Sequence, residues 1–346
     1  MKVCVIGGGS WGVSLANVLN DNNHDVSIYF RDKKQIDYIK ENGKSNKYLK
    51  DFVFPKEIKL TNSISEAIDG SKIIVLATPL QQIVEILEEI KPYLKGDEVI
   101  VDASKGIHFE RLQTASEIVE DILGDISYAV LSGPSHAEEV SKRMITTVAC
   151  ASTDEEVAKF VQDAFMTEYF RVYIHKDVLG VEVAGAIKNV IAIGAGVLTG
   201  LDQGDNAKAA LITRGLFEMS KLGKSLGCNP LTFMGLAGMG DLIVTANSIH
   251  SRNFRAGLLI GKGVPINKLQ EEIGETVEGV NTAKAVHLLS EKMGVNMPIC
   301  KVIYEVLYEG KGIDIAIHEL MNRPRKHEFM EMMEIWKKKE SILPSL

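Results

Sequence analysis

The feature that most constrains the fold of this chain is a glycine-rich turn that begins at its seventh residue. The apolar run VCVI leads directly into GGGSWG at residues 7–12. A G-x-G-x-x-G turn between a strand and a helix predicts a dinucleotide-binding βαβ unit. In such a unit Gly7 permits the turn, Gly9 lets the backbone approach a pyrophosphate, and Gly12 lets the helix pack on the strand. We therefore expect a pyrophosphate to lie on the N-terminus of the first helix.

Charged residues follow the second predicted strand, at the position that selects between NAD and NADP. An NAD site usually has an acidic residue here, about 20 residues after the turn, to hold the ribose hydroxyls. This chain has Arg31 there, followed by Lys33 and Lys34. Asp32 stands beyond the position at which an acidic residue binds the ribose. Because a guanidinium can pair with a 2′-phosphate, the pattern favours NADP over NAD. The alternative is a solvated cluster of charges at the strand end.

Short β-branched runs alternate with amphipathic stretches in the first half of the chain, which predicts a parallel sheet covered by helices. The segments that we predict as strands are Lys2–Ile6, Asp25–Phe30, Lys72–Ala77, Glu98–Asp102, Tyr128–Leu131 and Thr146–Ala151. After about Lys176 such runs stop and helical patterns continue to the end. We therefore predict an α/β dinucleotide-binding domain over residues 1–178 and an all-helical domain over residues 179–346.

Within the second half, the run Val183–Leu201 carries a single charge, Lys188. A helix that is apolar on all sides is expected to be buried, so we predict that this segment is the core helix of the second domain. Glycines and prolines divide the remainder into further helices. The last stretch, Met321–Leu346, contains the basic cluster RPRK followed by an acidic amphipathic pattern, for which a solvated tail is the expectation.

Composition excludes several classes of protein. The net charge of −7 argues against nucleic-acid binding, which normally uses a basic surface. The longest uncharged apolar run, Asn189–Leu201, is shorter than the roughly 20 residues that a membrane span needs, so we expect no membrane insertion. Four scattered cysteines give neither a disulfide framework nor a metal site. The first residues lack the pattern of a secretory signal, and we expect a cytoplasmic protein.

Three further segments place polar residues where apolar runs end: ASKG at 103–106, SGPSHA at 132–137 and LAGMGDL at 236–242. The first two follow strands, at the edge where open α/β sheets bind ligands. Together with GGGSWG, AGAIKNV around Lys188, SRN at 251–253, VEGVNT at 277–282 and MNRPRKHE at 321–328, they resemble the bacterial-type NAD(P)-dependent glycerol-3-phosphate dehydrogenase family. The motifs follow one another in order along nearly the whole chain.

The resemblance implies a Rossmann-type doubly wound domain followed by an all-α domain like that of 6-phosphogluconate dehydrogenase. It also implies NADP or NAD as cofactor and a small phosphorylated three-carbon substrate. The implied catalytic residues are Lys188 as proton acceptor and donor, Lys105 and Asp241. The implied cofactor-binding residues are Gly7, Gly9, Ser10, Trp11, Gly12, Arg31, Tyr48, Lys105, Ala137, Arg252, Thr276 and Glu278. The implied substrate-binding residues are Lys105, Gly133, Ser135, Lys188, Asp241, Ser251, Arg252 and Asn253.

The residue types suit this chemistry. Oxidation of an alcohol needs a base within hydrogen-bond reach of the hydroxyl, and burial lowers the pKa of a lysine toward neutrality. Arg252, flanked by Ser251 and Asn253, offers a planar fork and neutral donors to a phosphate. Each residue also has an ordinary structural interpretation: Lys188 can be a lysine that snorkels to the surface, and Asp241 a helix N-cap.

Two positions depart from the family pattern. His136 stands where the family usually has Phe, and Ala246 where it commonly has Cys. Neither supplies the implied chemistry, although His136 can alter packing or the pH dependence near the phosphate. Two other functions remain open at this point: another two-domain dehydrogenase of the β-hydroxyacid or 6-phosphogluconate type, and a non-catalytic NAD(P) sensor. The apolar helical second domain is compatible with a homodimer.

Overall fold

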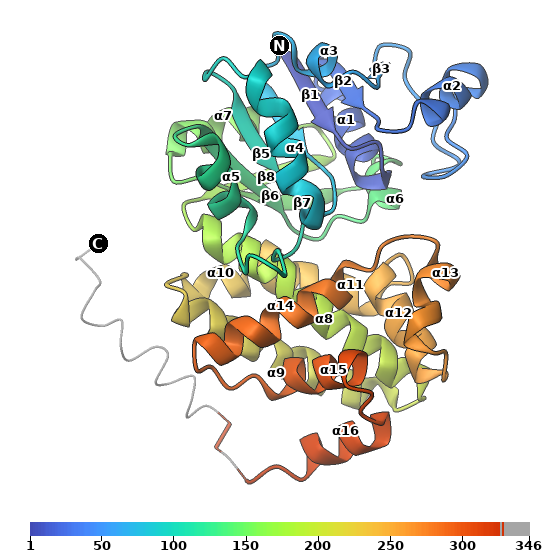
Figure 1. Ribbon diagram of the computed structural model, residues 1–346, viewed down its shortest axis with the longest axis vertical. Coiled ribbons are helices and arrows are strands. Elements are labelled where there is room, and N and C mark those ends of the chain that lie inside the picture. The colour runs from blue at the N-terminus through green and yellow to red at the C-terminus, as the bar shows by residue number, and fades with distance from the viewer. Residues whose placement is uncertain (326, 329–346) are drawn as a thin grey trace.

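A computed structural model describes residues 1–325 and 327–328 of the chain. Figure 1 shows two stacked halves: a sheet flanked by helices, formed by the first half of the chain, and a bundle of helices, formed by the second. The predicted fold class, a Rossmann-type domain followed by a helical domain, is confirmed. The amphipathic pattern predicted near the C-terminus lies outside the described residues.

The sheet of the first half has eight strands in the order β3-β2-β1-β4-β5-β6-β7-β8. The bounds are β1 (Lys2–Ile6), β2 (Asp25–Tyr29), β3 (Lys59–Thr61), β4 (Ile73–Leu76), β5 (Val99–Asp102), β6 (Ser127–Ser132), β7 (Thr146–Ala151) and β8 (Phe170–His175). All six predicted strands are present. β1 is the third strand in this order and pairs in parallel with β2 and β4.

Two features of the sheet differ from the prediction. β3 and β8 were not predicted, and β7 pairs with β6 in antiparallel orientation. Only the short helix α6 (Ala137–Val140) lies between β6 and β7. A parallel return usually has a helix that runs back along the sheet, and the four residues of α6 are too few for this, which agrees with the reversed direction of β7. The longer helix α7 (Glu155–Phe165) then allows β8 to run parallel to β7.

Alternating side chains of β1 explain how both faces of the sheet are covered. Val3 and Val5 pack into a core that also contains residues of α1 and α7, and Cys4 and Ile6 pack into a second core with residues of α3, α4 and α5. Successive residues of a strand point to opposite faces, so an uninterrupted apolar run is what a sheet buried on both sides requires. The remaining helices of this half are α1 (Ser10–Asp21), α2 (Lys33–Asn42), α3 (Ile64–Ile68), α4 (Ile83–Ile90) and α5 (Ala115–Leu123).

The second half is built around α8 (Val178–Gly200), which confirms the predicted core helix. By length and composition α8 would pass as a membrane span, but 94% of its most apolar window is buried by the rest of the protein. The surrounding helices are α9 (Gly204–Ser225), α10 (Pro230–Met234), α11 (Asp241–Asn247), α12 (Arg252–Gly261), α13 (Leu269–Ile273), α14 (Glu278–Lys292), α15 (Pro298–Tyr308) and α16 (Ile313–Met321). A π-helical turn, Leu236–Gly240, precedes α11.

Glycines bring α8 and α12 into backbone contact. A Cβ atom added to Gly257 of α12 would lie 1.9 Å from the carbonyl oxygen of Ile193, and one added to Gly196 of α8 would lie 2.1 Å from that of Phe254. Real atoms do not approach so closely, and only glycine fits at these two positions. The contact fixes the position of α12 against α8, and the SRN motif forms the N-cap and first two residues of α12.

Candidate active site

The predicted site residues come from both halves of the chain and converge on one cavity of about 450 Å³, a volume typical of small-molecule sites. Its lining includes most of the residues named from the sequence: Gly9, Ser10, Trp11, Tyr48, Lys105, Ser135, Ala137, Lys188, Asp241, Ser251, Arg252, Asn253, Thr276 and Glu278. Gly7, Gly12, Gly133 and Arg31 are not part of the lining. The first three shape the loops beneath it.

The glycine-rich turn has the geometry that a dinucleotide needs. Gly7 has a φ of +126°, and a Cβ on Gly12 would lie 1.9 Å from the Gly7 carbonyl oxygen. A Cβ on Gly9, in contrast, would meet nothing within 4 Å, so open space lies above this residue. No side chain caps the N-terminus of α1. The free N–H groups and the helix dipole there suit an anionic group such as a pyrophosphate.

The residues that the sequence predicts to bind the cofactor differ in their surroundings. Trp11 donates a hydrogen bond from its indole nitrogen to the carbonyl oxygen of Ala103 (3.1 Å). The carbonyl oxygen of Ala137 accepts a hydrogen bond from Ser14, which ties α6 to α1. Arg31 is exposed at the end of β2. Asp32 is the N-cap of α2, and its carboxylate accepts a hydrogen bond from the backbone N–H of Lys34 (2.9 Å). This side chain therefore caps a helix rather than serving as the ribose-binding acid.

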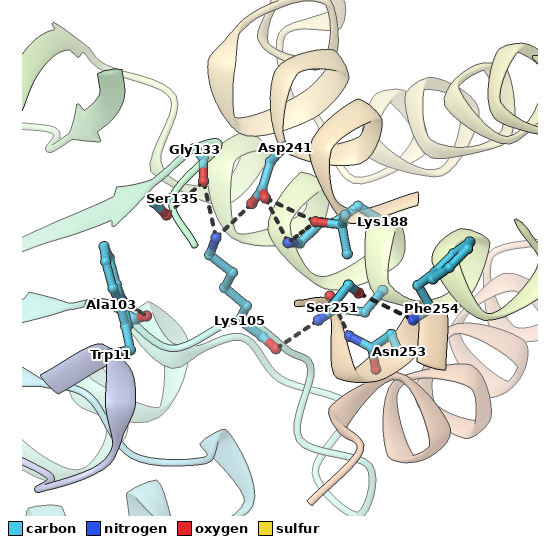
Figure 2. Close-up of polar contacts among 12 residues, drawn as sticks. Trp11, Ala103, Lys105, Gly133, Ser135, Lys188, Asp241, Ser251, Asn253 and Phe254 are labelled. Carbon is cyan, nitrogen blue, oxygen red and sulfur yellow. Dashed lines mark hydrogen bonds and ion pairs between the residues drawn. The ribbon is translucent and has the colours of Figure 1, made fainter. Parts of the chain in front are cut away.

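Two lysines share one buried carboxylate at the other end of the cavity. Asp241 begins α11 and binds Lys188 through Oδ1 and Lys105 through Oδ2, both at 2.7 Å. Figure 2 shows the two ammonium groups converging on it. The side chains of Lys188 and Asp241 are only 6% and 2% exposed, so Lys188 does not snorkel to the surface. Thr245, one turn after Asp241, accepts a further hydrogen bond from Lys188 (2.7 Å).

These contacts and the burial of the side chains set the protonation states of Lys188 and Asp241. Burial lowers the pKa of Lys188 to about 8, with Lys105 acting in the same direction and Asp241 in the opposite one. Burial alone would raise the pKa of Asp241, but the two lysines hold it below its usual value. Lys188 is therefore a cation at neutral pH that can lose its proton within about one pH unit, as a proton donor and acceptor must.

The loop after β6 completes this end of the cavity. The carbonyl oxygen of Gly133 accepts hydrogen bonds from Lys105 (3.1 Å) and from the Ser135 hydroxyl (2.8 Å). Gly133 has a φ of +152°, and a Cβ there would lie 2.9 Å from the Cα of Val148. The loop thus turns tightly beneath β7 and holds Lys105 over the cavity.

The N-terminus of α12 lies beside the lysines. Ser251 is its N-cap and accepts from the backbone N–H of Phe254 (3.1 Å), and Arg252 forms an ion pair with Glu275 (3.3 Å). Asn253 donates to the side chain of Asn189 (2.9 Å), the residue after Lys188. A cation and a helix N-terminus at one place favour an anion such as a phosphate.

Several lining residues had not been predicted, among them Lys47, Asn189, Thr245, His250, Arg255 and Glu275. Some carry a local signal that the sequence offered. Thr245 is four residues after Asp241 and Arg255 three after Arg252, spacings that put each pair on one helix face. Among the described residues there is no group of His, Cys, Asp or Glu side chains that could hold a metal.

The fold and the cavity define a class: an NAD(P)-dependent dehydrogenase with a Rossmann-type first half, a helical second half and a buried lysine in the cavity. Comparison with known proteins narrows the class. The model of the N-terminal domain of NAD-dependent glycerol-3-phosphate dehydrogenase matches residues 2–158, and the model of its C-terminal domain matches residues 177–318. The chain belongs to the NAD-dependent glycerol-3-phosphate dehydrogenase family.

Comparison with individual proteins gives the same family. A glycerol-3-phosphate dehydrogenase (NAD(P)+) of Bacillus cereus is 48% identical over 332 residues, which cover 94% of this chain and 97% of the relative. The crystal structure of the glycerol-3-phosphate dehydrogenase of Coxiella burnetii is 34% identical, with a TM-score of 0.90 over 93% of this chain and 99% of that one. A ketopantoate reductase of Ralstonia eutropha, at 14% identity and a TM-score of 0.60, shares the fold alone.

Proposed function

We propose that this protein interconverts sn-glycerol 3-phosphate and dihydroxyacetone phosphate with NADP or NAD as the hydride carrier. The observation that carries the proposal is the cluster of buried Lys188, buried Asp241 and partly buried Lys105, which lies in the same cavity as the glycine-rich turn. Membership of the glycerol-3-phosphate dehydrogenase family supports the choice of substrate.

When bound, the nicotinamide supplies or accepts the hydride. In the reducing direction, the ammonium group of Lys188 donates a proton to the oxygen on C2 of the ketone. In the oxidising direction, its neutral amine accepts the proton of the C2 hydroxyl. Lys105 polarises the same oxygen with a second positive charge. Asp241 positions both lysines and keeps the pKa of Lys188 from falling further.

Arg252, Ser251 and Asn253 would hold the phosphate, with the N-terminus of α12 adding partial positive charge. Ser135 and the backbone at Gly133 would contact the substrate from the other half of the chain. Thr276, Glu278 and Tyr48 would line the path of the cofactor. Burial raises the pKa of Glu278, so this side chain takes a proton more readily than an ordinary glutamate does.

We also propose the finer points of the role. Arg31 is exposed and free to pair with a 2′-phosphate, which favours NADPH. Reduction of dihydroxyacetone phosphate by a cytoplasmic enzyme would supply glycerol 3-phosphate for glycerophospholipid synthesis. We propose that the chain divides into two domains between residues 178 and 179, at the start of α8, and that it forms a homodimer through the helical domain.

The direct test mixes the purified protein with dihydroxyacetone phosphate and follows the absorbance of NADPH and, separately, of NADH. We expect oxidation of both, with NADPH the better substrate, and little turnover with unphosphorylated dihydroxyacetone. A protein that binds either cofactor but oxidises neither would remove the proposed reaction and favour a sensor. Faster turnover of an unphosphorylated hydroxyacid would favour the β-hydroxyacid dehydrogenase alternative.

A further inference from the structure

Arg255 is a second arginine on α12 whose role neither the sequence nor the family membership assigns. It lies one helical turn after Arg252, on the same face, and lines the same cavity. Its Nε atom is buried without a hydrogen-bond partner. No hydrogen bond or ion pair joins its side chain to any other residue within the described part of the chain.

An arginine in this state is unusual. The guanidinium group is always charged and carries five N–H donors, and leaving a buried donor of a charged group unsatisfied is unfavourable. Arg252 differs, since Glu275 neutralises it in this structure. Arg252 has a carboxylate partner and Arg255, one helical turn later, has none. This contrast indicates that Arg255 is available to bind an anionic ligand in the cavity.

Arg255 lies further along α12 than the residues of this helix that stand at the substrate end of the cavity. Asn253 binds Asn189, next to Lys188, so α12 begins at the substrate end. Arg255 lies two residues beyond Asn253, and therefore about 3 Å further along the helix axis. Gln270 and Gly274 line the cavity on the same half of the chain, and Lys47 and Tyr48 line it on the nucleotide half.

The glycine-rich turn leaves room for such a contact. Residues 7–12 contain no charged side chain, so the turn offers a pyrophosphate backbone N–H groups, the helix dipole and the Ser10 hydroxyl, but no full positive charge. A pyrophosphate carries two negative charges, and a guanidinium binds phosphate oxygens in a bidentate manner. We propose that Arg255 binds the pyrophosphate of the dinucleotide from the helical half, opposite the N-terminus of α1.

This inference rests on the proposed function for the identity of the cofactor, but its test does not need turnover. The probe is ADP-ribose, which has the adenosine and the pyrophosphate of the cofactor but no nicotinamide. Its dissociation constant is measured by calorimetry for the wild type, Arg255→Gln and Arg255→Lys. Arg171→Gln, which alters an exposed arginine on β8 away from the cavity, is the matched control.

We expect Arg255→Gln to weaken ADP-ribose binding about tenfold, Arg255→Lys to weaken it less because the charge is kept, and Arg171→Gln to have no effect. The KM for dihydroxyacetone phosphate and the inhibition constant of inorganic phosphate should stay unchanged. Thermal unfolding of each variant checks the fold, and the lysine variant keeps the test decisive if the glutamine variant is unstable.

Two results would overturn the assignment. Unchanged ADP-ribose binding in both variants would mean that Arg255 contacts no pyrophosphate. A raised inhibition constant for inorganic phosphate with unchanged ADP-ribose binding would place Arg255 at the substrate phosphate instead. Absence of turnover in the wild type with normal ADP-ribose binding would count against the proposed reaction and leave the assignment of Arg255 intact.

Discussion

The two ends of the cavity are built in opposite ways. At the nucleotide end the chain offers backbone groups: an uncapped helix N-terminus and a turn of glycines with open space above Gly9. At the substrate end it offers three charged side chains, of which Lys188 and Asp241 are buried and Lys105 is partly buried, held by side-chain contacts of 2.7 Å. A ligand that only has to bind can be held by the backbone, whereas a proton can be transferred only by a titratable side chain.

The difference also separates local from long-range structure. The turn is one continuous segment of six residues. Lys105, Lys188 and Asp241 stand up to 136 residues apart and come from a loop after β5, from the core helix and from the first turn of α11. Mutations at the substrate end should therefore change the rate of the reaction, and mutations at the nucleotide end should change cofactor binding.

The largest expected effect is that of Lys188→Ala. We expect kcat to fall by about two to four orders of magnitude, because general acid–base groups typically contribute that much. Cofactor binding should stay close to that of the wild type, since Lys188 lies at the other end of the cavity. Steady-state kinetics with dihydroxyacetone phosphate and a fluorescence titration with NADPH measure the two effects. Near-normal kcat would remove Lys188 from the mechanism.

Gly9→Ala should have the opposite pattern, with weaker cofactor binding and little change in kcat. A Cβ on Gly9 meets no protein atom within 4 Å, so the melting temperature should not change, but the methyl group would stand where the pyrophosphate approaches. We expect cofactor affinity to fall about tenfold, with kcat at saturating cofactor little altered. Gly12→Ala is the informative partner, because its Cβ would lie 1.9 Å from the Gly7 carbonyl oxygen and should lower the melting temperature as well. Equal melting temperatures for the two variants would contradict this distinction.

The smallest expected effect is that of His136→Phe. His136 lines the cavity, with the ring of His250 5.8 Å away. Burial and the nearby charges of Lys188 and Lys105 hold the pKa of His136 below its usual value, and Glu138 acts in the opposite direction. His136 is therefore neutral at pH 7 and gains its charge only in acid. We expect the KM for dihydroxyacetone phosphate to differ from that of the wild type by about threefold, and only below about pH 6.5. Identical pH profiles would show that His136 serves packing alone.

The sequence predicted the parts of the fold whose signals are local. The six predicted strands appear as short runs of mostly apolar and β-branched residues, and most of the core helix α8 appears as a long run with one charge. β3 was missed because it has only three residues at the edge of the sheet. β8 was missed because Arg171 and Tyr173 interrupt its apolar residues. Their side chains alternate with the buried Phe170 and Val172, which is the pattern of a strand covered on one face.

The site was predicted less completely, for a physical reason. Resemblance to a family named the charged residues, but not the contacts that set their pKa values, since those join segments far apart in the chain. The hydrogen bond from Lys188 to Thr245 and the bond from Asn253 to Asn189 depend on how α11 and α12 pack on α8. That packing follows from glycines such as Gly196 and Gly257, whose role appears only when the helices are brought together.

The central claim is that Lys188 transfers the proton and that its buried contacts tune it to do so. The most direct measurement is the pH dependence of kcat/KM for oxidation of glycerol 3-phosphate. The pKa of Lys188 is about 8 and the neutral amine is the acceptor, so the rate should be low below this pH and rise through it. In Asp241→Asn the rise should move to lower pH, because the carboxylate that favours the charged form of Lys188 is gone. A rate that does not change with pH between about 6 and 10 in the wild type would contradict the account.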